Sequence, residues 1–256
     1  MTKATEVLWS RNAVYEVLRA GRREVRRVEI AEGRRDSARL QMIERLCAER
    51  GIAIERVGRG RFDKVSGDHE GVVAEVSTYP YADLPDLLQL AQERGEPPFV
   101  LLLDALQDPQ NFGTLLRTAE AVGVHGAVIP LARTVEVTPA VVNASAGATE
   151  HLLITRSNLA QAIDALKAED VWIVGLDPGG EVLDETADRH LRGALGLVVG
   201  SEGEGMRSLV RAKCDIRMRL PMRGQVESLN ASVAGSIAIY MAYRARQRVS
   251  HGAKHA

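Results

Sequence analysis

Two segments of the chain place glycine beside polar or charged residues in a pattern that could serve a ligand. In DPQNFGTLLRTAEA (108–121), Gly113 permits a close approach of the backbone, and Arg117 supplies a cation four residues later. In GSEGEGM (200–206) the spacing is G-x-x-G-x-G, which is not the G-x-G-x-x-G of dinucleotide-binding folds. Taken singly, the first is an ordinary strand–helix connection, and the second is more typical of a tight turn than of a ligand cradle.

A third segment, LPMRGQVESLNASVAG (220–235), presents hydroxyl and amide side chains at the start of a long apolar pattern. Ser228 can cap a helix that begins there, which accounts for its hydroxyl in structural terms. Capping by Ser228 leaves Asn230 unexplained.

Alternating strands and helices predict the domain that must position these segments. Phe99–Asp104 is a continuous apolar run, typical of a strand buried on both faces of a parallel sheet. We expect further strands at 127–129, 151–155, 171–176, 194–200 and 216–220, and helices at 113–122, 139–146, 158–168, 206–212 and 228–247. This order predicts βαβ crossovers and a mostly parallel sheet, whose ligands bind beyond the carboxyl ends of the strands.

The first 78 residues predict a smaller α/β unit, near the lower end of domain sizes. Its expected helices are 11–20 and 37–50, and its expected strands are 26–30, 52–57 and 71–76. The proline-rich residues 79–98, with a short helix at 85–94, are expected to form a structured linker to a domain over 99–256.

Charge is balanced overall but unevenly distributed along the chain. The 256 residues hold 33 Lys and Arg against 34 Asp and Glu. Basic residues collect in 1–35, 206–223 and 244–256, whereas acidic residues collect in 161–192. A single basic cluster is usually a solvated helix face, but three of them moderately favour a polyanionic partner.

Patterning excludes several classes of protein. The longest apolar runs, such as Phe99–Leu103, are far shorter than the roughly 18 residues of a membrane span, and MTKATEVLWSRN lacks the apolar core of a signal peptide. Cys47 and Cys214 fit neither a disulfide framework nor zinc spacing, and His69 and His151 are not spaced as metal ligands. We therefore expect a cytoplasmic protein without a metal.

Together, in their order and spacing, the three segments resemble the motifs of the SpoU/TrmH branch of the SPOUT RNA methyltransferases. The family's N-x-G-x-x-x-R-T-A-E-A matches Asn111–Ala121, its G-S/A-E-G-x-G matches Gly200–Gly205, and its P-M-x-G-x-x-x-S-L-N-x-S-x-A matches Pro221–Ala234. Residues 10–78 resemble the RNA-binding domain, similar to ribosomal protein L30e, that precedes the catalytic domain in 23S rRNA ribose methyltransferases.

This resemblance implies a fold and a reaction. The fold is an L30e-like α/β domain (1–78), a linker (79–98) and a catalytic α/β domain (99–256) with a mostly parallel sheet and a trefoil knot. The reaction is transfer of a methyl group from S-adenosylmethionine to a ribose 2′-hydroxyl of RNA, with the donor bound by Gly200, Leu220 and Leu229. Glycine lets the backbone approach the adenosyl group, and the leucines offer apolar walls, although either leucine could equally be core packing.

The resemblance also assigns a role to each candidate catalytic residue. The family casts the residue at Arg117 as a base, but a guanidinium with a pKa above about 12 is rarely a proton acceptor. We expect Arg117 instead to bind the adjacent phosphate and stabilise the developing alkoxide. Asn111 and Glu202 would orient Arg117, while Ser228 and Asn230 would bind ribose or phosphate.

The same resemblance implies a homodimer formed through the catalytic domain, with each site built partly from the partner subunit. For the substrate, the L30e-like domain favours ribosomal RNA, most simply a guanosine of 23S rRNA. The alternatives are methylation of transfer RNA and a non-catalytic RNA-binding protein of ribosome assembly. The complete set of motif residues argues against the last of these.

Overall fold

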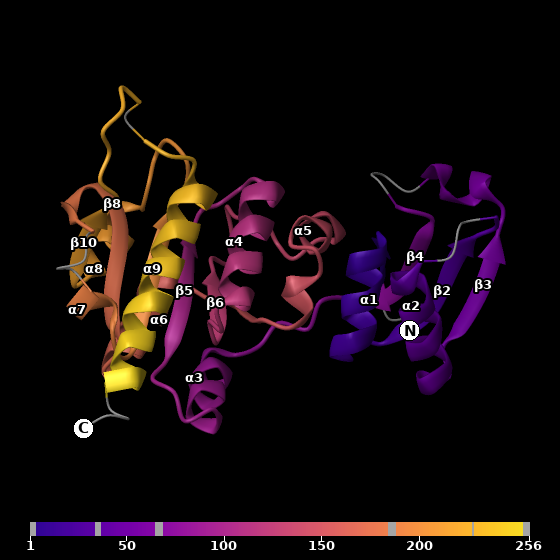
Figure 1. Ribbon diagram of the computed structural model, residues 1–256. Helices are drawn as coiled ribbons and strands as arrows, with labels where there is room; N and C mark the ends of the chain where they lie inside the picture. The colour runs from indigo at the N-terminus through magenta and orange to yellow at the C-terminus, as the bar shows by residue number, and fades with distance from the viewer. Residues whose placement is uncertain (1–3, 34–36, 65–68, 184–187, 227, 253–256) are drawn as a thin grey trace. The chain divides into compact units, whose positions relative to one another are not determined.

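The computed structural model describes residues 4–33, 37–64, 69–183, 188–226 and 228–252 (Figure 1). Contacts divide the chain into two compact units. One consists of Met1–Pro80 and Glu136–His151, and the other of Tyr81–Val135 and Leu152–Ala256.

The N-terminal unit is built on a four-stranded sheet in the order β1-β4-β2-β3. Only β2 and β3 run parallel, and β4 is antiparallel to both β1 and β2. The strands are β1 (Thr5–Trp9), β2 (Val25–Ala31), β3 (Ala53–Val57) and β4 (Val72–Ser77), and the helices are α1 (Arg11–Ala20), α2 (Ala38–Arg50) and the 3₁₀ helix η1 (Arg59–Lys64). Strand β1 was not expected from the sequence, because it buries only Leu8 and shows no apolar alternation.

A segment from the second half of the chain belongs to this N-terminal unit. It holds α5 (Pro139–Ala144) and the 3₁₀ helix η2 (Ala148–Glu150). The hydroxyl of Tyr79 donates to the carbonyl of Thr149 at 3.0 Å, and the buried guanidinium of Arg23 lies 3.4 Å from the buried carboxylate of Glu150. A division at residues 79–98 would assign this segment to the catalytic domain, but its contacts lie with the N-terminal unit.

The second unit is a six-stranded parallel sheet in the order β10-β8-β9-β5-β6-β7, which confirms the expected α/β class. Its strands are β5 (Phe99–Asp104), β6 (Gly126–Ile129), β7 (Leu153–Arg156), β8 (Trp172–Val182), β9 (Leu195–Gly200) and β10 (Ile216–Arg219). Its helices are α3 (Leu84–Glu93), α4 (Pro109–Ala121), α6 (Leu159–Ala168), α7 (Asp188–Leu191), α8 (Ser208–Lys213) and α9 (Ala231–Gly252). Every residue of β5 and β9 is buried, as the continuous apolar run at 99–104 predicts.

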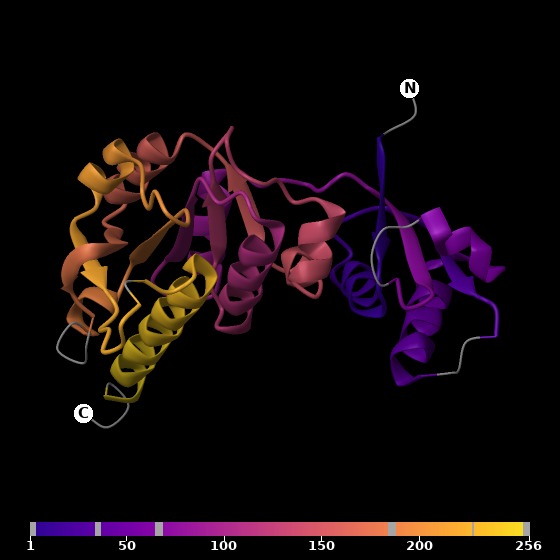
Figure 2. The ribbon, with the colours of Figure 1, turned by 90° about the horizontal axis from the view of Figure 1, so that it is seen from above.

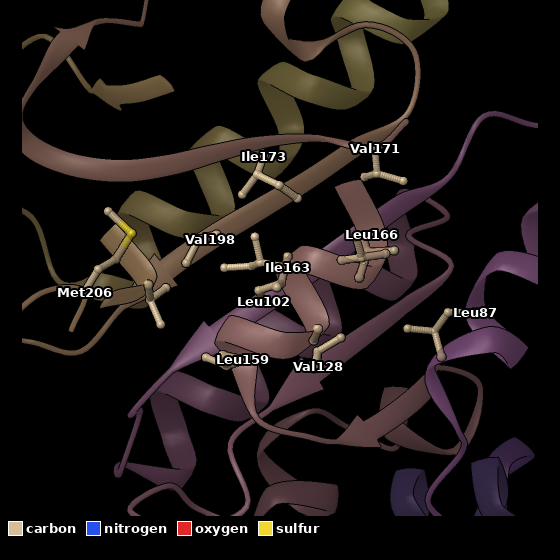
Figure 3. Packing of buried hydrophobic residues seen from close by; sticks show 13 residues of the cluster. Leu87, Leu102, Val128, Leu159, Ile163, Leu166, Val171, Ile173, Val198 and Met206 are labelled. Atoms are coloured by element: carbon tan, nitrogen blue, oxygen red, sulfur yellow. The ribbon is translucent and has the colours of Figure 1, made fainter. Parts of the chain in front are cut away.

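Both faces of this parallel sheet are covered by helices. On one face Leu159, Ile163 and Leu166 of α6 pack against strand side chains such as Leu102 and Val198 (Figure 3). On the other face α4 and α9 lie side by side (Figures 1 and 2), joined by a 3.0 Å hydrogen bond between the hydroxyls of Thr118 and Ser236. After the edge strand β10 the chain returns to the middle of the sheet, where α9 packs against β9.

His125 is a core residue of the second unit. Its side chain is fully buried, its Nδ1 accepts a hydrogen bond from the backbone N–H of Phe99 at 3.0 Å, and its Nε2 lies 3.1 Å from a carboxylate oxygen of Glu96. Burial lowers the pKa of His125, the positive charge of Arg94 adds to this effect, and Glu96 opposes it. His125 is therefore a neutral packing residue near pH 7.

Candidate active site

A cavity of about 730 Å³ lies at the carboxyl ends of β9 and β10, where a parallel sheet is expected to bind its ligand, and beside the middle of β8. Its walls come from residues 176–178 within β8, from the ends of β9 and β10 and the segments that follow them, and from the start of α9. The predicted donor-binding residues Gly200, Leu220 and Leu229 all line it, and so do Glu202 and Ser228. Segments that are distant in sequence thus share one pocket.

The glycine loop at 200–205 is a tight turn that also forms a wall of this cavity. The backbones of Ser201 and Gly205 exchange two hydrogen bonds of 3.0 and 3.1 Å. A Cβ on Gly200 would lie 2.3 Å from the carbonyl carbon of Gly205 and 2.4 Å from the nitrogen of Met206. Because both obstacles are backbone atoms, only glycine fits at position 200. The loop is therefore a tight turn and, at the same time, one wall of the cavity.

Three predicted catalytic residues meet beside the cavity in one hydrogen-bonded cluster. The Asn111 Nδ2 donates to Glu202 Oε1 at 2.8 Å, and the Asn230 Nδ2 donates to Asn111 Oδ1 at 3.0 Å and also to Glu202 Oε1. Ser232, which the sequence did not single out for a role, joins them by donating its hydroxyl to Asn111 Oδ1 at 3.0 Å. We call Asn111, Glu202, Asn230 and Ser232 the polar cluster.

The cap of α9 is Asn230, and the expectation that Ser228 caps a helix beginning at 228 is wrong. The helix starts at Ala231, and Asn230 Oδ1 accepts from the backbone N–H groups of Ser232 and Val233 at 2.9 and 3.2 Å. Asn230 therefore uses its oxygen in the cap and its nitrogen in the polar cluster. Ser228 lies before the helix, exposed and facing the cavity.

Helix α4 also begins earlier than the sequence suggested, at Pro109 rather than Gly113. Asp108 caps it by accepting from the backbone N–H groups of Gln110 and Asn111 at 3.2 Å each. Proline suits the first helical position because its missing N–H would have no partner there. This cap places Asn111 in the first turn of the helix.

Arg117 lies apart from the polar cluster of its own chain. It is six residues beyond Asn111 on α4, which corresponds to about 9 Å along the helix axis and about 120° around it. It is exposed and forms no hydrogen bond or ion pair with any residue in the described ranges. Within one chain, the described hydrogen bonds of Asn111 and Glu202 stay inside the polar cluster and the adjoining backbone and do not reach Arg117. That these two residues orient Arg117 stays a prediction.

Part of the positive charge of the basic segments is neutralised in the folded chain. Four of the six basic residues of 206–223 form ion pairs with aspartates: Arg207 with Asp104, Arg211 and Arg217 with Asp177, and Lys213 with Asp164. Arginines of the N-terminal unit similarly pair with its glutamates. Charge clusters in the sequence therefore do not by themselves mark an RNA-binding surface, because ion pairs of this kind cancel charges locally.

Thiol and metal chemistry find no support in the part of the chain that the structure describes. Burial raises the pKa of Cys47 and of Cys214 to about 11, so both remain thiols near pH 7. The described His, Cys, Asp and Glu residues contain no group of three placed to hold a metal ion. Among the described helices, none has the length and hydropathy to span a membrane.

Comparison with known proteins agrees with this geometry. Residues 98–240 match the model of the SpoU rRNA Methylase family, and residues 10–82 match that of the RNA 2′-O ribose methyltransferase substrate binding domain. A relative from Bacillus subtilis strain 168, which carries the name TrmH family tRNA/rRNA methyltransferase YacO, is 43% identical over 251 residues, which are 97% of this chain and 99% of the relative.

Solved structures share the fold. The SpoU methyltransferase AviRb from Streptomyces viridochromogenes superposes with a TM-score of 0.77 at 24% identity, over 96% of this chain and 91% of its own. The S-adenosylmethionine-bound rRNA methyltransferase from Sinorhizobium meliloti gives 0.73 at 21% identity, over 94% and 87%. The TrmH/SpoU tRNA modifying enzyme of A. aeolicus gives 0.53 at 24% identity, over 65% of this chain and 84% of its own. The chain belongs to the SpoU family of RNA methyltransferases, which use S-adenosylmethionine.

Proposed function

We propose that this RNA 2′-O-methyltransferase acts on ribosomal RNA, at a guanosine of 23S rRNA. The observation that carries the choice is the two-part architecture. The rRNA methyltransferase from Sinorhizobium meliloti shares the fold over 94% of the chain, whereas the tRNA modifying enzyme shares it over 65%. The N-terminal module at 10–82 is then the part that selects a structured ribosomal RNA.

The cavity suits S-adenosylmethionine in size and chemistry. Its volume lies within the range of about 300–1,000 Å³ typical of small-molecule sites. Gly200 offers bare backbone, and Leu220 and Leu229 offer apolar walls for the adenosyl group. When bound, the donor supplies an electrophilic methyl group on a sulfonium. The protein must then hold a ribose hydroxyl in line with that methyl group.

We assign complementary roles to the polar residues. The polar cluster forms a pre-ordered edge of the site, in which Glu202 Oε1 is committed to the asparagines. Ser228, exposed at the cavity, is placed to hydrogen-bond the ribose or its phosphate. Arg117 binds the phosphate beside the target nucleotide and stabilises the alkoxide that forms as the hydroxyl loses its proton.

We further propose a homodimer through α9, in which Arg117 serves the site of the partner subunit. Val233, Ile237 and Tyr240 form an apolar stripe on one face of this helix, with 46%, 40% and 53% of each side chain exposed. Ser236, within the same stretch of α9, contacts Thr118, the neighbour of Arg117 on α4. A second copy docked on this stripe would therefore approach Arg117.

The deciding experiment is a map of 2′-O-methylated nucleotides in total RNA from a strain that lacks the gene. Loss of one methyl group in 23S rRNA supports the proposal, and loss in a transfer RNA replaces it with the tRNA alternative. Isothermal titration of the purified protein with S-adenosylmethionine tests the remaining alternative. Absence of binding would indicate a non-catalytic RNA-binding protein.

A further inference from the structure

Asp104 is a buried carboxylate beside the glycine loop to which neither the motifs nor the proposed reaction gives a role. It is the last residue of β5, and its backbone pairs with Gly200, the last residue of β9. Its side chain is fully buried. One oxygen accepts from the backbone N–H of Arg207 at 2.7 Å, and the other accepts from the Arg207 Nε at 2.6 Å. Asp104 does not line the cavity.

The glycine loop needs an anchor at this place. Between Gly200 and Arg207 the chain turns back so closely that Gly205 occupies the space a Cβ on Gly200 would need. The hydrogen bonds between Ser201 and Gly205 close the turn on itself but do not attach it to the sheet. Asp104 makes that attachment, because its backbone lies beside the start of the turn and its carboxylate binds the residue just after it.

We propose that Asp104 is a positioning residue for the cofactor cavity. Its carboxylate holds the exit of the glycine loop against the sheet and so sets the wall formed by Gly200 and Gly205. The same anchor places Glu202, which lies within the loop, against Asn111 and Asn230. A buried carboxylate is costly unless it is paired and hydrogen-bonded, and here it satisfies one backbone donor and one cation. The proposal rests on the assignment of this cavity to S-adenosylmethionine.

Two substitutions separate the backbone anchor from the ion pair. Arg207→Ala removes the guanidinium but leaves the backbone N–H bonded to Asp104. Asp104→Asn keeps one acceptor for that N–H, but its amide nitrogen then faces the Arg207 Nε, so two donors meet. We expect R207A to bind S-adenosylmethionine within about threefold of wild type and D104N to bind at least about tenfold more weakly. In the double variant the opposed donor is gone, and the affinity should return to within about threefold of R207A.

The measurement is isothermal titration of the full-length protein with S-adenosylmethionine, accompanied by thermal unfolding of each variant. The rescue of D104N by R207A is a result that a general loss of stability would not produce. Wild-type affinity in folded D104N, or a double variant as weak as D104N alone, would overturn the proposal. If D104N does not fold, Asp104→Ala is introduced into R207A, which removes the acceptor for the backbone N–H of Arg207. Binding at least about tenfold weaker than that of R207A supports the proposal, and equal affinity refutes it. Failure of the wild type itself to bind would instead refute the assignment of the cavity.

Discussion

Whether Arg117 acts in its own subunit or in the other can be decided with heterodimers. Arg117 lies about 9 Å along α4 and about 120° around it from Asn111, so its side chain diverges from the polar cluster of the same chain. Arg117→Ala and Glu202→Gln should each inactivate the homodimer, with losses of about 10²–10³ in kcat, as expected when one stabilising donor or its support is removed.

The prediction concerns the mixed dimer of these two variants. If Arg117 serves the partner subunit, the R117A subunit keeps an intact polar cluster and receives its arginine from the E202Q subunit. One of the two sites is then complete, and a purified heterodimer should show about half of the wild-type activity. If Arg117 acts within its own chain, each site lacks one component and the heterodimer is as inactive as either homodimer.

The assay is methyl transfer from labelled S-adenosylmethionine to RNA, with heterodimers isolated through a different affinity tag on each subunit. Glu120→Ala is the matched control, because Glu120 is an exposed charged residue on the same helix and should be dispensable. Background activity in a heterodimer of verified composition would refute the assignment of Arg117 to the partner's site. Full activity of the R117A homodimer would remove this residue from the mechanism altogether.

Three further predictions follow from single positions. A Cβ at Gly200 would meet backbone atoms at 2.3 Å, so Gly200→Ala should weaken S-adenosylmethionine binding at least about tenfold by titration. Gly58→Ala is the control: no atom lies within 4 Å of its added Cβ and Gly58 does not line the cavity, so this variant should bind normally. On α9, Ile237→Asp should convert the dimer to a monomer in sedimentation analysis, whereas Leu209→Asp, at a leucine of α8 that is more exposed than Ile237, should not. A monomeric wild type would contradict the proposed interface. Burial lowers the pKa of His125, so the folded protein favours the neutral imidazole. The free energy of unfolding should therefore be highest above a pH of about 6.5, which is the pKa of an unperturbed histidine. Below that pH it should fall by at most about 1.4 kcal/mol per pH unit. Urea unfolding at pH 7.5 and 5.5 measures this change in the free energy of unfolding. In His125→Gln the change between the two pH values should be smaller. If it is as large as in the wild type, other groups cause the acid sensitivity.

Much of the fold follows from local patterns. The apolar run Phe99–Leu103 predicts a central strand, and it is one because five consecutive apolar side chains can be buried only between two covered faces. Helix α1 matches its expected bounds, since Ser10 caps its start and Gly21, in the left-handed conformation, ends it. The glycine spacing at 200–205 similarly predicts the turn that is found there.

Helix starts were predicted less well because several residues in a row could serve as caps. Near α9 both Ser228 and Asn230 are acceptable cap residues, and only the folded chain shows that Asn230 takes this position. Near α4 the cap is Asp108, so the helix begins before the first apolar residue. Propensity favours a cap within a few residues but does not choose among neighbours of similar preference.

What the sequence by itself determined was the class of fold and the positions of the three motifs, because hydrophobic period, capping and turn residues act over a few positions along the chain. Only the tertiary structure decided which motif residues meet. Asn111 donates to Glu202, which is 91 residues away, and accepts from Asn230, which is 119 residues away. It also decided that Glu136–His151 packs with the N-terminal unit and that four of the six basic residues of 206–223 pair with three aspartates. Such pairings depend on the strand order and on the path of the chain between strands, and no local pattern encodes either of these.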